Sequence, residues 1–319
     1  MAVSIALPPG FQMRPARLDD LEAVFAVMKA QEISDYDESA LSLDAMRAAW
    51  QAQLPRMWVV SAADGQIVAC GEMTTYLSTT ASALLVWVLP AYQGRGIGTT
   101  LLLLLESWEQ EQRAAAGQQA SQGFFTQVGG RNTNARRVLE KSGYTCSSIF
   151  QIMELAMSAP PQVPAVSDGL AVRLFVAGQD EQAVYEADEE AFMEKRGKTP
   201  RSFEVWSRRL GLGTPRFDPA LWFVAWDGDT IAGTAMSEVI AGPRGEVMHV
   251  GVRRPWRHRG LGMALLLRTL GEFYQRGIHT VRLNVDAESL TNAQQLYARA
   301  GFQAINSYCN YEKIWDRHL

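Results

Sequence analysis

The stretch that decides the fold is Val86-Trp-Val-Leu-Pro-Ala-Tyr-Gln93-Gly-Arg-Gly96-Ile-Gly98-Thr-Thr-Leu101, which returns as Val250-Gly-Val-Arg-Arg-Pro-Trp-Arg257-His-Arg-Gly260-Leu-Gly262-Met-Ala-Leu265. Each copy has the pattern of a strand end, a turn rich in proline and glycine, and the start of an apolar helix. An internal repeat at this spacing indicates a duplicated domain. With 319 residues, the chain is long enough for two domains that each bury their own core.

The same order of elements is predicted around both copies. Strands are predicted over 11–15, 58–61, 67–73 and 124–128, and again over 170–175, 222–225, 231–237 and 280–285. Helices are predicted over 18–31, 43–53, 97–113 and 134–141, and again over 179–192, 203–210, 261–276 and 292–299. Each half then ends in a predicted closing hairpin, over 143–155 and 301–315. Hairpins early and strand–helix alternation late predict an α/β (α+β) fold, with a mixed sheet flanked by helices in each half.

A proline-rich segment separates the two halves. Residues 158–168 contain three prolines and no helical periodicity, which is typical of a linker. We therefore expect an N-terminal domain over 1–157 and a C-terminal domain over 169–319.

Composition limits the kinds of partner. The formal net charge of −4 argues against nucleic acid as the main ligand, and the longest apolar runs are too short to span a membrane. Arg253, Arg254, Arg257 and Arg259 cluster inside the second repeat, which favours a small anionic ligand. The three cysteines show neither a disulfide framework nor a metal-ligand spacing, so we expect no metal and a cytoplasmic location.

The repeated stretch carries its own chemistry. A glycine turn that opens a helix leaves backbone N–H groups free at the positive end of the helix dipole, where a pyrophosphate binds. The glycines let the backbone approach phosphate oxygens, and Gln93 or Arg257 can fold over the loop. The spacing fits neither the dinucleotide motif G-x-G-x-x-G nor a Walker A loop.

The pattern [Gln/Arg]-x-x-Gly-x-Gly after a V-x-V strand, followed by Asn-Ala and Gly-[Tyr/Phe], resembles the GNAT superfamily of acyl-CoA N-acyltransferases. The tandem layout further resembles its mycothiol synthase type of two-domain protein. This resemblance implies two tandem GNAT-like domains, with acetyl-CoA as co-substrate in a gap between two splayed parallel central strands. It also implies that a backbone amide of the V-x-V strand bonds the thioester carbonyl.

The resemblance assigns cofactor contacts to both copies. In the second they are Val250, Gly251, Val252, Arg257, His258, Arg259, Gly260, Leu261, Gly262, Met263 and Asn292. In the first they are Val86, Trp87, Val88, Gln93, Gly94, Arg95, Gly96, Ile97, Gly98 and Thr99. Asn292 is equally well explained as a helix cap.

Acid–base residues distinguish the halves. Aligned on the glycines, Glu246 falls opposite Ser82, and aligned on Asn-Ala, Tyr297 falls opposite Leu139. The resemblance implies that Glu246 is the general base and Tyr297 the general acid, so we expect the second domain to be catalytic. His249 is a rival base, although strict strand alternation places it on the opposite face from Glu246 unless a β-bulge intervenes.

These features predict an N-acetyltransferase that moves an acetyl group from acetyl-CoA to a primary amine of a small molecule. The first domain then either binds acetyl-CoA without catalysis or only preserves the fold. Two alternatives stay open, a non-catalytic acyl-CoA-binding or sensing protein and an acetyltransferase for protein N-termini or lysines. Asp286 either holds substrate or caps a loop. We expect no nucleic-acid or membrane partner, and a monomer or weak homodimer.

Overall fold

The computed structural model describes residues 6–75, 82–115, 123–166, 169–193, 200–240, 244–288 and 293–314. They form two compact units. The first joins Met1–Ile149 to Ser307–Leu319, and the second is Phe150–Asn306. Residues 150–157 therefore belong with the second unit, and residues 307–319 with the first, which differs from the division expected at the proline-rich segment.

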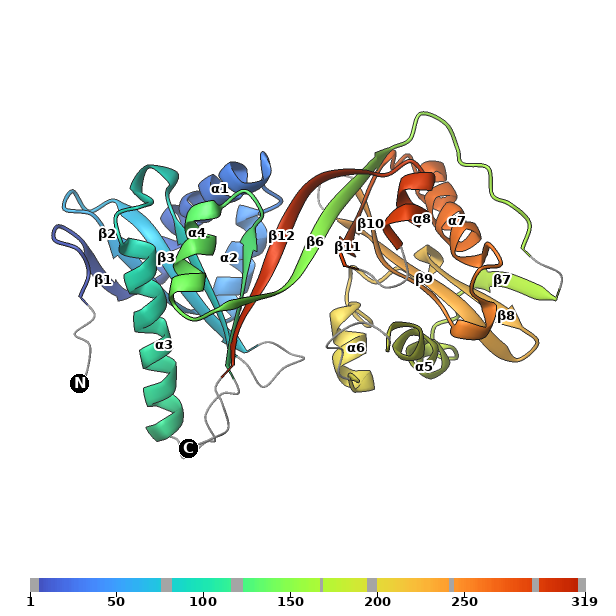
Figure 1. Cartoon of the computed structure of the whole chain (residues 1–319), viewed down its shortest axis with the longest axis horizontal. Coiled ribbons are helices and arrows are strands. Elements are labelled where there is room, and N and C mark those ends of the chain that lie inside the picture. The colour runs from blue at the N-terminus through green and yellow to red at the C-terminus, as the bar shows by residue number, and fades with distance from the viewer. Residues whose placement is uncertain are drawn as a thin grey trace. The chain divides into compact units, whose positions relative to one another are not determined.

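The first unit is a mixed sheet with helices packed on it (Figure 1). Its strands run in the order β1, β2, β3, β4, β5 and the end of β12, with only the β4–β5 pair parallel. The strand bounds are β1 (Gln12–Pro15), β2 (Arg56–Ser61), β3 (Ile67–Thr75), β4 (Ser82–Val88), β5 (Gly123–Gly129) and β12 (Gln303–Ile314). The helices are α1 (Leu21–Tyr36), α2 (Leu43–Ala52), α3 (Ile97–Ala115) and α4 (Thr133–Lys141).

The second unit repeats this plan. Its strands run in the order β7, β8, β9, β10, β11 and the end of β6, with only the β10–β11 pair parallel. The strand bounds are β7 (Leu170–Leu174), β8 (Trp222–Asp227), β9 (Thr230–Ile240), β10 (Arg244–Val252), β11 (Thr280–Asp286) and β6 (Thr145–Ala156). The helices are α5 (Glu181–Phe192), α6 (Phe203–Arg209), α7 (Leu261–Gln275) and α8 (Ala293–Arg299). The predicted mixed, mostly antiparallel sheet flanked by helices is confirmed in both units.

The two predicted closing hairpins are wrong. β6 and β12 are each one unbroken strand, because neither segment contains a glycine, a proline or a turn dipeptide at which the chain can reverse. Each strand therefore ends in the sheet of the other half of the sequence. The end of β6 pairs with β11, and the end of β12 pairs with β5. Figure 1 shows these two long strands, each with one end in each unit.

Buried side chains hold the end of β6 in the sheet of the second unit and the end of β12 in the sheet of the first. In the first unit, Cys309 and Tyr311 of β12 lie in the core, and the Lys313 ammonium lies 2.6 Å from a carboxylate oxygen of buried Glu106 on α3. In the second unit, Met153 of β6 lies in the core. The exchange is therefore part of each hydrophobic core.

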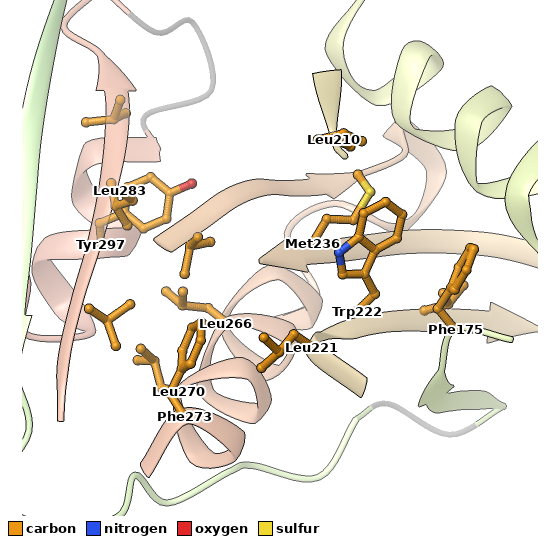
Figure 2. Packing of buried hydrophobic residues seen from close by; sticks show 14 of the residues in the cluster. Phe175, Leu210, Leu221, Trp222, Met236, Leu266, Leu270, Phe273, Leu283 and Tyr297 are labelled. Atoms are coloured by element: carbon orange, nitrogen blue, oxygen red, sulfur yellow. The ribbon is translucent and has the colours of Figure 1, made fainter. Parts of the chain in front are cut away.

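The core of the second unit holds β10 against α7. Leu266, Leu270 and Phe273 of α7 pack with aromatic residues of the sheet in one cluster (Figure 2). A Cβ atom at Gly245 would lie 2.7 Å from the Phe273 ring, so only glycine allows the helix this close to the strand. This contact fixes the start of β10, immediately before Glu246. No helix among the described residues is long and apolar enough to cross a membrane.

Candidate active site

Two parallel strands separate beyond their first residues in each unit. β10 and β11 pair only from Arg244 with Thr280 to Val247 with Leu283, although both strands continue further. The Arg253 N–H donates to the Ala232 carbonyl on β9. Because N–H directions alternate along a strand, Val250 and Val252 turn their N–H groups away from β9, toward the gap beside β11. The second unit thus presents a free strand edge in a gap.

The first unit has the same gap. β4 and β5 pair only at Ser82 with Phe124 and Ala83 with Phe125. The Leu89 N–H donates to the Val68 carbonyl, and so Val86 and Val88 face the gap. The splayed central strands expected from the sequence are therefore present in both units.

The glycine loops follow these strand ends. Gly260 is the N-cap of α7 with φ of +78°, and Gly96, before α3, has φ of +85°. Two residues earlier, Gly94 and His258 also adopt left-handed conformations, with φ of +74° and +61°. Successive turns of this kind direct backbone N–H groups into an anion-binding concavity at a helix start.

The second glycine of each motif has another role. A Cβ at Gly262 would lie 3.6 Å from Val252 Cγ2, and one at Gly98 would lie 3.4 Å from Val88 Cγ2. Neither glycine has a positive φ. Both distances are ordinary van der Waals contacts, so Gly98 and Gly262 lie where the helix approaches the strand, whereas Gly96 and Gly260 supply the left-handed turn.

The Gln or Arg of the motif ties the loop to the strand. Arg257 Nε donates to the Val252 carbonyl at 3.0 Å, and its guanidinium also donates to the Ala191 carbonyl at 3.2 Å. Gln93 Nε2 donates to the Val88 carbonyl at 3.3 Å in the first unit. These side chains fold back as expected and brace the end of β10 or β4.

The remaining predicted contacts lie on the same elements. The other residues assigned to the second copy lie at the end of β10, in the loop and in the first turn of α7: Gly251, Arg259, Leu261 and Met263. Their counterparts lie on β4, its loop and the first turn of α3: Trp87, Arg95, Ile97 and Thr99. Asn292 lies outside the described residues.

Glu246 is partly buried on β10 and faces a second carboxylate. Its Cα pairs directly with that of Glu238 on β9, and Asn284 Nδ2 of β11 donates to Glu246 Oε1 at 3.2 Å. Burial raises the pKa of Glu246 and the charge of Glu238 raises it further, although nearby arginines including Arg216 oppose both effects. A carboxylate whose pKa is raised is a better proton acceptor near neutral pH.

A β-bulge corrects the position expected for His249. The β9–β10 pairing passes from Val247 opposite Ser237 to His249 opposite Met236, so Met248 is the extra residue. Because the bulge shifts the alternation by one residue, His249 shares a face with Glu246. Strict alternation, which placed it on the opposite face, fails here.

His249 is held by a buried carboxylate on α5. Its Nδ1 lies 2.9 and 3.0 Å from the two carboxylate oxygens of Asp188, which has no exposed surface. Trp206 Nε1 donates to Asp188 Oδ2 at 2.9 Å. Burial acts to raise the pKa of Asp188, but the charge of His249 and these hydrogen bonds outweigh it and lower that pKa. Asp188 is therefore an ionised acceptor inside the unit.

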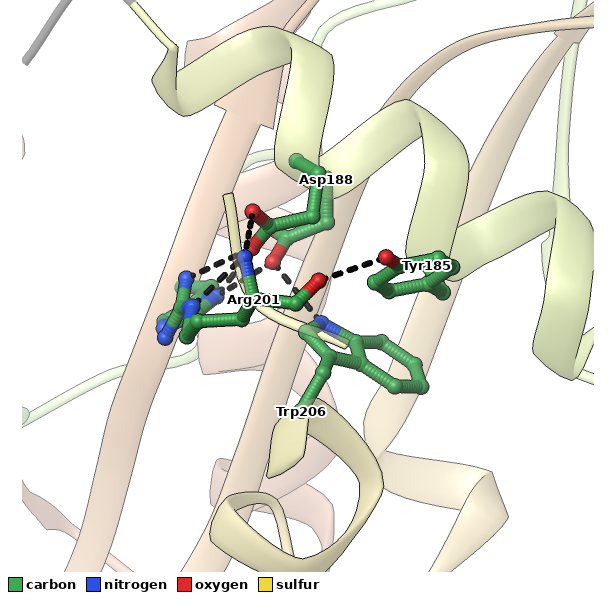
Figure 3. A network of polar contacts seen from close by, with 6 residues as sticks. Tyr185, Asp188, Arg201 and Trp206 are labelled. Carbon is green, nitrogen blue, oxygen red and sulfur yellow. Dashed lines mark hydrogen bonds and ion pairs between the residues drawn. The ribbon is translucent and has the colours of Figure 1, made fainter. Parts of the chain in front are cut away.

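Figure 3 shows that this carboxylate belongs to a network between α5 and the segment before α6. Arg201 pairs with Glu189 at 2.9 Å, and the Tyr185 hydroxyl donates to the Arg201 carbonyl at 2.6 Å. Three consecutive acidic residues of α5 thus have structural partners, since Glu190 also pairs with Arg253 at 2.7 Å. No pattern in the sequence links Asp188 to His249, which is 61 residues away.

Tyr297 lies on α8, against the same sheet. Its ring packs edge-on to Phe302 at 6.1 Å between centroids, and only 8% of the residue is exposed. Figure 2 shows the ring beside Leu283, with the hydroxyl directed away from Phe273. Burial raises its pKa to about 12, so the phenol stays protonated and can donate a proton near neutral pH.

The described residues of the first unit that correspond to Glu246, His249 and Tyr297 are apolar. Because β10 contains the bulged Met248 and β4 has no such residue in its pairing with β3, the register makes Ala83, not Ser82, the counterpart of Glu246. Leu85 occupies the position of His249, and buried Leu139 that of Tyr297. Among the described residues of either unit, no group of three or more potential metal ligands gathers.

Comparison with known proteins agrees with this geometry. The model of the acetyltransferase (GNAT) family matches residues 21–144 and again 182–302. A mycothiol acetyltransferase of Thermobispora bispora is 32% identical over 219 residues, which cover 67% of this chain and 70% of that protein. One from Geodermatophilus obscurus is 29% identical over 252 residues, which cover 76% and 78%.

Solved structures show the same arrangement. A GCN5-related N-acetyltransferase from Sphaerobacter thermophilus superimposes with a TM-score of 0.81 at 34% identity, over 97% of both chains. A tandem GNAT protein from the clavulanic acid biosynthesis pathway has the same fold, with a TM-score of 0.66 at 17% identity over 95% and 98% of the two chains. The chain therefore belongs to the GNAT family and is an acyl-CoA-dependent N-acetyltransferase with two tandem GNAT domains.

Proposed function

We propose that the second unit transfers an acetyl group from acetyl-CoA to a primary amine of a small molecule. One observation carries this proposal. The second unit combines the splayed edge and glycine loop with a carboxylate of raised pKa, Glu246, and a protonated phenol, Tyr297, at positions where the described residues of the first unit have Ala83 and Leu139. The names of the curated relatives make an amine of the mycothiol type the first acceptor to test.

The residues present fit acetyl-CoA. The edge of β10 offers N–H groups at Val250 and Val252, and the loop around Gly260 offers the amides of a helix start. An extended chain of amides can pair with such an edge as an added strand, while the loop takes the pyrophosphate. A Cβ built at Gly260 would meet no described atom within 4 Å, so the loop is open.

The reaction needs two proton transfers. Glu246 accepts the proton of the substrate ammonium, and the free amine attacks the thioester carbonyl. The C–N bond forms and the C–S bond breaks, with the developing oxyanion bonded by the Val250 N–H. Tyr297 gives its phenolic proton to the departing sulfur. The amine's second proton leaves through solvent, which also returns one to the phenolate, since a phenol with a pKa of about 12 is protonated at neutral pH.

The test is acetyl transfer to a panel of primary amines, followed by release of the free CoA thiol. Glu246→Gln and Tyr297→Phe should each lower kcat by about 10²–10⁴-fold, the usual contribution of a general base or acid. Acetyl-CoA affinity should stay nearly unchanged. Matched controls on the last turns of α7, Glu272→Gln and Tyr274→Phe, should keep full turnover.

Normal turnover by both site variants refutes the assignment of base and acid. Acetyl-CoA binding without thiol release for any small amine supports the acyl-CoA-binding or sensing alternative. Thiol release with peptides alone supports acetylation of protein N-termini or lysines.

A further inference from the structure

The strand edge that faces the gap differs between the two units. In the second unit, the Val252 N–H faces the gap, and Ala191 at the end of α5 packs beside this part of β10. A Cβ built at Gly251, the residue before Val252, would lie 3.1 Å from the Ala191 Cβ. Alanine carries no acceptor, so it leaves the Val252 N–H for a ligand.

A longer side chain occupies this position in the first unit. α1 and α5 are anchored alike, by Arg14 to Asp20 and by Arg173 to Asp180, each through two hydrogen bonds. Counted from these aspartates, Ala191 corresponds to Gln31.

Gln31 bonds the strand edge of its own unit. Its Oε1 accepts a hydrogen bond from the Val88 N–H at 2.6 Å, while Gln93 Nε2 donates to the Val88 carbonyl. Both backbone groups that Val88 turns toward the gap are therefore engaged by side chains.

The Gln31 side chain also lies near a buried carboxylate. Asp35, one turn further along α1, accepts from Asn132 Nδ2 at 3.3 Å, and Gln31 is one of the groups that oppose the rise of its pKa through burial.

Pro8 lies beside the phosphate loop of the first unit. A Cβ built at Gly96 would lie 3.5 Å from Pro8 Cγ, in the segment before β1. The equivalent position at Gly260 meets no described atom within 4 Å. The nearby segment is packed, since Phe11 meets Tyr92 of the loop edge-on, with ring centroids 6.2 Å apart.

We propose that the chain binds one acyl-CoA, in the second unit, because Gln31 and Pro8 close the corresponding site of the first. This inference rests on the proposed function for the identity of the ligand. The first unit is then a GNAT domain in which Gln31 takes the place of the pantetheine arm and Pro8 narrows the approach to the phosphate loop.

The experiment is calorimetric titration of the full chain with acetyl-CoA, in the absence of an amine. We expect one site per wild-type chain and two sites in the double variant Pro8→Gly with Gln31→Ala. Turnover by the double variant should equal that of the wild type, because the second unit is untouched. Lys29→Ala, on an exposed position of α1, is the control and should keep one site.

The reciprocal exchange tests the second unit. Ala191→Gln should weaken acetyl-CoA binding at least tenfold and lower kcat/KM in parallel, with an unfolding midpoint near that of the wild type. Two sites in the wild-type chain overturn the inference, as does a single site in the double variant. No binding by the wild-type chain refutes instead the proposed function.

Discussion

The buried pair of Asp188 and His249 gives a prediction whose size follows from the structure. Asp188 accepts from two donors, His249 Nδ1 and Trp206 Nε1, with no exposed surface. Asp188→Asn keeps the shape but removes the charge and replaces one acceptor oxygen by an NH₂ donor beside His249 Nδ1. A buried donor left unsatisfied costs about 1–3 kcal/mol, and bonds to a charged acceptor are worth about 1.5–3 kcal/mol.

We therefore expect Asp188→Asn to lower the free energy of unfolding by roughly 2–4 kcal/mol. For a unit of this size, that corresponds to a fall in Tm of roughly 5–15 °C. The assay is thermal and urea unfolding at pH 7, followed by tryptophan fluorescence, since Trp206 and Trp222 are buried in this unit.

The contribution of Asp188 to folding stability should change with pH in a definite direction. Because the pKa of Asp188 is lowered in the folded state, its contribution to stability is complete above the unfolded pKa of about 3.9. That contribution is lost as pH falls below this value, through the folded pKa. The stability difference between wild type and Asp188→Asn should thus shrink below pH 4.

The first unit supplies a matched control, because it has Met28 and Leu85 at these two positions. Asp188→Met alone should be as harmful as Asp188→Asn, and adding His249→Leu should recover part of the loss, since a buried polar pair can be replaced by apolar residues. An Asp188→Asn variant that unfolds at the wild-type midpoint would show that the carboxylate is not the acceptor on which this reasoning depends.

Three further predictions concern the site and the exchanged strand. In the pH profile of kcat/KM, the midpoint of the acid limb should lie above the ordinary glutamate pKa of about 4.3, because Glu246 must be ionised and its pKa is raised. Glu238→Gln removes a like charge and should move that midpoint to lower pH. Gly260→Ala should lower the free energy of unfolding by about 1–2 kcal/mol, because the residue has a positive φ, and should weaken acetyl-CoA binding. Gly262→Ala makes only an ordinary contact with its neighbour, so calorimetry should show unchanged stability and unchanged binding. Lys313→Met should lower the free energy of unfolding of the first unit by roughly 3 kcal/mol in urea titrations, because the buried Glu106 carboxylate on α3 loses its partner. An unchanged unfolding midpoint would show that this ion pair does not hold β12 in the sheet.

Local patterns predicted most of the fold. The repeated strand, glycine turn and helix appear where expected, because hydrophobic periodicity and left-handed glycines act over a few residues. The closing hairpins failed because a strand without a turn gives no indication of which sheet completes it. The partner of β12 is β5, about 180 residues earlier in the chain, and only the packed core selects that pairing.

In the candidate site, too, local sequence patterns predict some features, while others depend on the tertiary fold. Glu246 and Tyr297 were predicted from residues aligned on short motifs, but the position of His249 depends on one bulged residue, Met248. A bulge adds a residue without changing the apolar character of a strand, so the sequence left the face of His249 open. Its partner Asp188 lies on another helix, and such a contact follows from the tertiary fold alone.

The two faces of the repeated strand, β4 or β10, are under different constraints. This difference explains how both copies keep the same fold while the proposed acid–base groups occur in one of them. The face toward α7 carries Val247 and Val250 in one cluster with the helix, and the matching face of β4 is equally apolar against α3. Substitution there leaves cavities or strain in a core, so both copies stay alike.

If catalysis belongs to the second unit, as proposed above, the opposite face of β4 is under no such constraint. Its positions beside α1 hold Met28 and Trp87 in a packed apolar cluster, where the second unit has Asp188 and Gly251. Filling a cleft with apolar side chains buries surface at about 25 cal/mol per Å² and removes the cost of keeping charges desolvated. On the proposed function, the first unit therefore gains stability where it has lost acid–base groups, and the buried charges beside β10 are what selection for turnover has to maintain.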